Sequence, residues 1–139
     1  MLIGEYTHTI DVKGRVNFPV KLLRHFGESF IVTRGLDNCL FVYSAEEWGR
    51  LEEKINAMPL SKARALQRFL FAGAVEVEPD RQGRILIPQN LREYAGLEKD
   101  VVVIGASDRA EIWDAARWAA DNEDLTSDQM AELMDSLNF

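Results

Sequence analysis

Two short segments of this chain place an aspartate four residues before an arginine, with a glycine between them. They are Asp11-Val12-Lys13-Gly14-Arg15 and Asp80-Arg81-Gln82-Gly83-Arg84. The guanidinium of arginine carries five N–H donors in a planar fork that suits phosphate groups and the edge of guanine, and an aspartate behind it can hold that fork in position. A simpler alternative stays open, in which each segment is a turn whose carboxylate only satisfies its own arginine and nearby amides. In either case we expect the turns to be shaped by Asp11, Gly14, Asp80 and Gly83.

Further basic residues accompany these segments and predict a surface that could follow phosphate groups. Between Lys13 and Arg24 the chain has four bases and no acid. The candidate DNA-binding residues are Lys13, Arg15, Lys21, Arg24, Arg81 and Arg84. The formal net charge of −7 argues at first against a nucleic-acid partner. However, residues 108–139 contain nine acids and two bases, so residues 1–107 have no net charge and the acidic balance does not exclude a local basic surface.

The two segments belong to a longer internal repeat. At the same offset of 69 positions Pro19 aligns with Pro88, and after a one-residue insertion the alignment continues with Val32 on Val102. We interpret the chain as a duplication, and we therefore expect its two halves to fold in the same way.

Both halves have the same predicted order of elements. Alternating apolar residues predict a strand before each aspartate and another after each arginine, and Pro19 and Pro88 fit the first position of a short helix. Two β-branched strands follow, then a longer helix that Ser44 or Asp114 can cap. Units of about 45 residues are too small to bury a good core alone, so we expect both halves to share one barrel-like core around a pseudo-two-fold axis.

Two helical segments complete the predicted organisation. Residues 45–72 fit a helical hairpin interrupted at Pro59, and Thr126 begins a last amphipathic helix with an acidic opposite face. We divide the chain into a first repeat, a helical connector, a second repeat and an acidic tail, at 5–47, 48–72, 73–119 and 120–139. Three roles stay open for the tail: packing on its own barrel or on a neighbouring subunit, competition with DNA for the basic surface, and binding of an external partner.

The duplicated Asp-x-x-x-Arg pattern resembles the signature of the MraZ family. The beginning of the chain, Gly4 to Asp11, and Gly73-Ala74 with Glu76 are also similar to that family, and the resemblance covers about residues 1–120. It implies an α+β fold of two AbrB/SpoVT-like half-repeats that share a swapped-hairpin β-barrel, with connecting and C-terminal helices.

The resemblance also implies a function. The family consists of bacterial transcriptional regulators that assemble into rings, lie on the nucleoid in the cytoplasm and bind short direct repeats in double-stranded promoter DNA. They typically repress the division and cell-wall gene cluster, including their own gene. A ring suits direct repeats, because neighbouring subunits of a cyclic assembly present the same face in the same sense. Since Gln82 stands where the first segment has Lys13, we expect Lys13 and Arg15 to be the principal contacts and Arg81 and Arg84 to be secondary.

Other classes of protein fit the sequence less well. Cys39 lies in an apolar run and the glutamate pairs at 46–47 and 52–53 lie on a predicted helix, so we expect no catalysis, cofactor, metal site or small-molecule substrate. No apolar run approaches the roughly 18 residues that span a membrane, and we expect no membrane partner. A protein-interaction module of the same barrel class, an antitoxin or a scaffold for which DNA is incidental, stays open as the alternative function.

Overall fold

The computed structural model describes residues 1–138, so that Phe139, the last residue of the predicted tail, lies outside the described residues. These 138 residues form eight strands, six α-helices, a 3₁₀ turn (η1) and a π-helical turn (η2). In chain order they are β1 (Glu5–Thr9), β2 (Arg15–Asn17), α1 (Val20–Leu23), β3 (Phe30–Arg34), η1 (Leu36–Asn38), β4 (Leu40–Ser44), α2 (Ala45–Asn56), α3 (Leu60–Leu66), η2 (Gln67–Phe71), β5 (Val75–Val77), β6 (Arg84–Leu86), α4 (Gln89–Ala95), β7 (Asp100–Gly105), β8 (Ala110–Asp114), α5 (Ala115–Glu123) and α6 (Ser127–Asp135). Pro19 and Pro88 stand one residue earlier than predicted, at the capping positions of α1 and α4.

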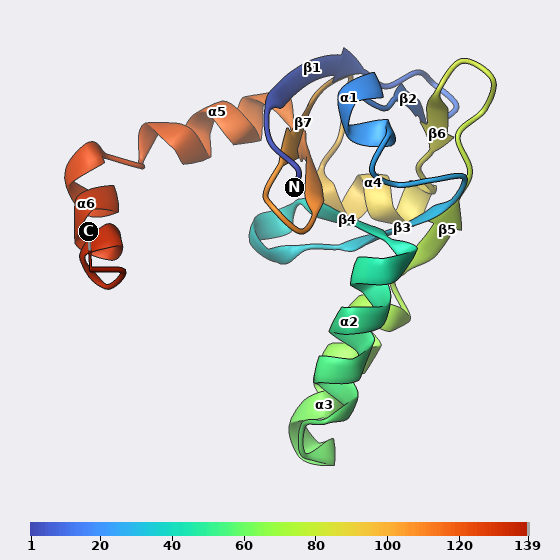
Figure 1. Ribbon diagram of the computed structural model, residues 1–139. Coiled ribbons are helices and arrows are strands. Elements are labelled where there is room, and N and C mark those ends of the chain that lie inside the picture. The colour runs from blue at the N-terminus through green and yellow to red at the C-terminus, as the bar shows by residue number, and fades with distance from the viewer. Residues whose placement is uncertain (139) are drawn as a thin grey trace.

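Two antiparallel sheets enclose the core. Six strands follow the order β1-β7-β8-β4-β3-β5, and β2 pairs with β6 in a separate two-stranded sheet, which we call the ribbon. The first strand of each half pairs with the third strand of the other half, because β1 lies beside β7 and β5 lies beside β3. Figure 1 shows the ribbon, α1 and α4 on one side of the larger sheet. The halves are therefore interlocked, and neither completes its sheet without the other.

The pairing within the ribbon is symmetric about two residues that are equivalent in the repeat. Val16 lies opposite Ile85, its counterpart 69 positions later. The flanking pairs are Arg15 with Leu86 and Asn17 with Arg84. The pairing of β4 with β8 is symmetric in the same way. A pseudo-two-fold relation between the halves follows from this register.

The strand register corrects one detail of the predicted repeat. Tyr6 in β1 lies opposite Val103, whereas Val75, its counterpart in the second half, lies opposite Val32. Val32 is therefore equivalent to Val103, and its predicted alignment with Val102 is wrong by one residue. The second half gains two residues before β7 and loses one in the turn before β8, and a plain sequence alignment merges these two changes into a single insertion.

One apolar core lies between the larger sheet and the inner face of the ribbon. Its completely buried side chains come from both halves of the chain. The largest are Phe30, Leu22, Leu40, Ile85, Ile87, Leu91, Ile112, Val16, Val32, Val42, Val101 and Val103. Removal of this apolar surface from water is the main source of stability, and because both halves contribute to it, neither half has a complete core of its own.

The predicted connector is a helical hairpin built from α2, α3 and η2, which we call the hairpin. Ile55, Ala63 and Leu70 are buried between its helices. The hydroxyl of Ser44 accepts the backbone N–H of Glu47 at 3.1 Å and caps α2, as predicted. Figure 1 shows the hairpin projecting from the two sheets.

The C-terminal helices α5 and α6, with the residues up to 138, form a second projection, which we call the arm. Thr126 and Gln129 form the predicted capping box at the start of α6. Figure 1 shows the arm reaching away from the two sheets, and none of the hydrophobic clusters in residues 1–138 includes a side chain of α6. Trp118 of α5 packs on Trp113 of β8, whereas residues 120–138 add no side chain to these clusters. In this part of the chain, no helix is both long and apolar enough to cross a membrane.

Candidate nucleic-acid interface

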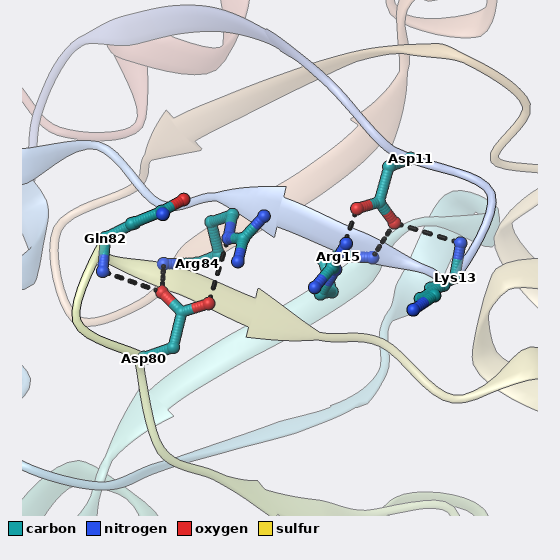
Figure 2. Close-up of polar contacts among 6 residues, drawn as sticks. All are labelled: Asp11, Lys13, Arg15, Asp80, Gln82 and Arg84. Atoms are coloured by element: carbon teal, nitrogen blue, oxygen red, sulfur yellow. Dashed lines mark hydrogen bonds and ion pairs between the residues drawn. The ribbon is translucent and has the colours of Figure 1, made fainter.

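The first Asp–Arg segment forms a turn in which one carboxylate accepts three N–H groups. Oδ1 of Asp11 accepts the backbone N–H groups of Lys13 at 3.0 Å and of Arg15 at 2.9 Å, and Oδ2 accepts Nε of Arg15 at 2.8 Å. Gly14 has a φ of +89°, in the left-handed region that glycine adopts without steric cost. Figure 2 shows this turn at one end of the ribbon.

The second segment, at the other end of the ribbon, repeats these contacts atom for atom (Figure 2). Oδ1 of Asp80 accepts the backbone N–H groups of Gln82 and Arg84, both at 2.9 Å, and Oδ2 accepts Nε of Arg84 at 2.9 Å. Gly83 has a φ of +78°. The two residues after the aspartate differ between the turns, so the shared geometry follows from the aspartate, the glycine and the arginine.

Both carboxylates favour their charged form. The hydrogen bond from the backbone N–H of Arg15 is the largest of the causes that hold the pKa of the Asp11 carboxyl below its ordinary value; the guanidinium acts in the same direction and desolvation opposes it. The pKa of Asp80 is lowered in the same way, first by the backbone N–H of Arg84. Within residues 1–138 both guanidinium groups donate only through Nε, which leaves their terminal Nη groups available to a ligand.

The two arginines lie on the outer face of the ribbon. Successive side chains of a strand point to opposite faces, and Val16 and Ile85 point into the core. The residues that point outwards are Arg15, Asn17, Arg84 and Leu86. The side chains of Arg15 and Arg84 are 35% and 26% exposed, so neither guanidinium is buried. Diagonal neighbours across an antiparallel pair lie roughly 7–8 Å apart, and the ribbon therefore presents two oriented guanidinium groups close together.

Each turn is held in place by the other half of the chain. The carbonyl of Gly14 accepts the N–H of Ile87 at 2.8 Å, and the carbonyl of Gly83 accepts the N–H of Phe18 at 3.0 Å. A Cβ atom on Gly14 would lie 2.7 Å from the carbonyl oxygen of Ile87, so a side chain there would push the halves apart. Each end of the ribbon is thus fixed to the other half of the chain.

The structure brings four of the six candidate DNA-binding residues to the ribbon and its turns. Lys13 and Arg81 are exposed on the two turns, next to the arginines described above. Arg24 follows α1 and is exposed. Lys21 is exposed on α1, where it borders a surface pocket with Met1 and Tyr6.

Sequence reasoning missed Arg92, which lies beside the first turn. Its Nε donates to the carbonyl of Ile87 at 3.0 Å and lies close to Gly14. The counterpart of Arg92 in the repeat is Leu23, which lies near Gly83 of the second turn. The repeat shows that Leu23 and Arg92 are equivalent. No signal in the sequence predicts that α1 and α4 each pack against the turn of the other half. Strand alternation alone could have identified Asn17 and Leu86 on the ribbon.

Among the residues considered for catalysis, Cys39 and the pair Glu46 and Glu47 have structural neighbours, and Glu52 and Glu53 are exposed on α2. Cys39 is completely buried among aromatic side chains, and burial raises the pKa of its thiol, so it belongs to the core as expected. On α2, Arg50 pairs with Glu46 at 2.8 Å and with Glu47. Among residues 1–138, no three His, Cys, Asp or Glu side chains are grouped so that they could hold a metal ion.

A known protein family matches each half of the chain separately. The family model described as "MraZ protein, putative antitoxin-like" matches residues 1–69 and again residues 70–135. Proteins named "Transcriptional regulator MraZ" from Acetivibrio thermocellus and Thermoanaerobacter sp. strain X514 are 55% and 56% identical to this chain over the whole length of both chains. The protein of that name from Heliobacterium modesticaldum is 58% identical over 88% of this chain and 87% of its own. The chain therefore belongs to the MraZ family, as its two Asp–Arg segments indicated.

Proposed function

We propose that this protein is a transcriptional regulator that binds double-stranded DNA with the outer face of the ribbon and the two turns. The observation that carries the proposal is the pair of guanidinium groups on one outward face, each oriented by a charged aspartate. The major groove of B-DNA admits a two-stranded ribbon, and an arginine that bonds O6 and N7 of guanine is the commonest specific contact there. The name that the relatives bear, transcriptional regulator, supports the same role.

The candidate side chains fall into two groups: those that recognise the base sequence and those that position the protein on the DNA backbone. Arg15 and Arg84 would meet base edges or phosphates, while Lys13 and Arg81 on the exposed turns would bind phosphates. The further phosphate contacts would be Lys21 and Arg24, and the residues that shape the turns would be Asp11, Gly14, Asp80 and Gly83. We keep Lys13 and Arg15 as the principal contacts, because the second turn has the uncharged Gln82 in the place of Lys13.

The proposal includes a ring of copies that binds short direct repeats. In a ring each ribbon points in the same sense along the circle, which suits head-to-tail sites. Several weak contacts made together also supply the avidity that offsets a net charge of −7. Family membership supports three further parts of the proposal. The target is the promoter of the division and cell-wall gene cluster, which includes the protein's own gene, and the effect is repression. The protein acts on the nucleoid, in the cytoplasm.

The same membership supports the assignment of the barrel to the swapped-hairpin class. The exchange of β1 and β5 between the halves fits that class. We retain the boundaries 5–47, 48–72, 73–119 and 120–139 as the proposed division of the chain.

The test is a mobility-shift titration on a fragment of the protein's own promoter, located first by footprinting. Arg15→Ala should lose about 1–3 kcal/mol, roughly 5- to 150-fold in affinity, if Arg15 makes a bidentate base contact. If it binds a phosphate instead, the slope of log affinity against log salt should change by about 0.9. Arg50→Ala is the matched control, since Arg50 is exposed on α2 and pairs with Glu46. Unchanged affinity and salt slope in Arg15→Ala would refute the assignment.

One observation favours the second candidate, a protein-interaction module of the antitoxin or scaffold type. Within residues 1–138 the arm carries exposed apolar side chains, among them Leu133 and Leu137, which are 65% and 64% exposed. If the wild-type protein binds its own promoter no more tightly than unrelated DNA at physiological salt, this candidate replaces the first.

A further inference from the structure

The outer face of the ribbon carries Asn17 and Leu86 in addition to the two arginines. Both side chains are exposed, that of Leu86 to 56%. Neither belongs to the core, because Val16 and Ile85 fill the inner face of the same two strands. A free amide and a free apolar side chain are both groups that can read base edges in the major groove.

The strand register places one of these two residues beside each arginine. Leu86 lies opposite Arg15, and Asn17 lies opposite Arg84. The Cβ atoms of directly opposite residues are about 4.5–5.5 Å apart, so each pair shares one end of the face. We call the first pair the Leu end and the second pair the Asn end of the ribbon. Figure 2 shows Arg15 beside the first turn and Arg84 beside the second.

The pseudo-two-fold relation between the halves equates the arginines but not their neighbours. At the offset of 69 positions Arg15 corresponds to Arg84, and Asn17 corresponds to Leu86. The rotation that exchanges β2 and β6 therefore places an amide on an apolar side chain. A ribbon with symmetric base contacts would read a palindrome, because the symmetry of an operator mirrors that of the protein. The outer face of this ribbon has a direction instead.

The two ends of the ribbon are far enough apart to face different base pairs. Residues two apart on a strand are separated by roughly 6.8 Å, which equals about two base steps of 3.4 Å. In the proposed function Lys13 and Arg81 bind phosphates, and such contacts carry no sequence information. A preference for one direction of the base sequence then comes from Asn17 and Leu86.

We propose that Asn17 and Leu86 are the specificity-determining residues that give each copy a direction on DNA. At the Asn end, Oδ1 of Asn17 accepts the N6 amino group of an adenine and Nδ2 donates to N7 of the same base. At the Leu end, Leu86 packs on the methyl group of a thymine in the equivalent position. The inference rests on the DNA binding in the proposed function and names the bases that the ribbon distinguishes. Head-to-tail repeats require such a direction, because a palindromic unit binds equally well in either sense.

Selection from a library of random DNA duplexes, followed by sequencing of the bound fragments, tests the assignment. The repeating unit enriched by wild type should lack two-fold symmetry, with adenine at the position of Asn17 preferred roughly 5- to 150-fold. Leu86→Asn should replace the thymine at its position by adenine and turn the unit into a palindrome. Leu36→Asn is the matched control, since Leu36 is 63% exposed in η1, and it should leave the unit unchanged.

A reciprocal exchange separates a changed base contact from damage to the ribbon. Asn17→Leu should enrich a second palindrome, with thymine at both equivalent positions. Asn17→Leu combined with Leu86→Asn presents the wild-type outer face rotated by half a turn, so this double variant should recover the wild-type unit. An unchanged unit in both single variants, or a double variant that does not recover the wild-type unit, would overturn the proposal.

Deoxyuridine supplies a second readout, at the level of one methyl group. In the enriched duplex, deoxyuridine in the place of the thymine should weaken wild-type binding roughly 4-fold for each repeating unit, the value of one buried methyl group. The affinity of Leu86→Ala for the two duplexes should be the same. An equal loss in wild type and Leu86→Ala would show that Leu86 does not contact the methyl group, and would overturn the proposal.

This inference and the proposed function can fail separately. If wild type enriches no sequence, sequence-specific binding fails and the inference fails with it. If wild type enriches a unit that is lost in Arg15→Ala, but that unit is a palindrome or does not respond to Asn17 and Leu86, the inference alone fails.

Discussion

Ile85 and Leu86 are neighbours of equal size on opposite faces of the ribbon, and they test its orientation directly. Ile85 is completely buried opposite Val16, so Ile85→Ala removes three carbon atoms from the core. At about 0.8 kcal/mol for each buried carbon the transfer cost alone is roughly 2.4 kcal/mol, and the cavity adds to it. Because the strand pairing keeps the ribbon from collapsing into the space, we expect a loss of about 3–5 kcal/mol in the free energy of unfolding.

Leu86 gives the matched comparison. Its side chain is 56% exposed, so Leu86→Ala removes surface that is mostly in water already and should lower the free energy of unfolding by about 1 kcal/mol or less. If the outer face enters the major groove, Leu86 can contact the methyl group of thymine. Leu86→Ala should therefore alter promoter binding while it leaves the barrel stable.

The assay is urea unfolding followed by tryptophan fluorescence, at one fixed protomer concentration because assembly contributes to stability. Mobility-shift titrations on the same samples report DNA binding. Equal losses of stability in Ile85→Ala and Leu86→Ala, or a loss below about 1 kcal/mol for Ile85→Ala, would refute the reasoning that the inner face of the ribbon is core and the outer face is free.

Three further predictions concern the turns and two glycines. Because hydrogen bonds lower the pKa of both Asp11 and Asp80 in the folded protein, their carboxylates stabilise it above their ordinary pKa of 3.8, and this contribution is lost as the pH falls below that value. The stability of Asp11→Asn with Asp80→Asn should therefore fall less than that of wild type between pH 5 and pH 3 in urea midpoints, and an identical pH profile would contradict the turn geometry. Gly49→Ala, in the interior of α2 with open space around it, should raise the thermal midpoint through a gain of about 1 kcal/mol. Gly105→Ala should lower it, since a Cβ there would collide with the backbone of Leu2 and Ile3; a rise would show that β7 can move away from the N-terminus.

Much of the candidate site was predictable because its contacts are local. Each aspartate bonds groups two and four residues ahead, so the order of residues is enough to build the turn. The two MraZ matches, on residues 1–69 and 70–135, agree with the duplication inferred from the same segments. Arg92 was not predictable, because its place beside Gly14 depends on how one half packs against the turn of the other.

The amino-acid sequence by itself determined the repeated unit, the turns, the helix caps at Ser44 and Thr126, and the alternation that gives each strand a core face. These features depend on hydrogen bonds and side-chain periodicity within a few residues of chain. Only the tertiary structure decided that β1 and β5 exchange partners between the halves, that Val32 corresponds to Val103, and that the arm leaves its apolar face uncovered. Those outcomes depend on the packing of segments far apart in the chain, where one shared core selects a single arrangement from several that local preferences allow.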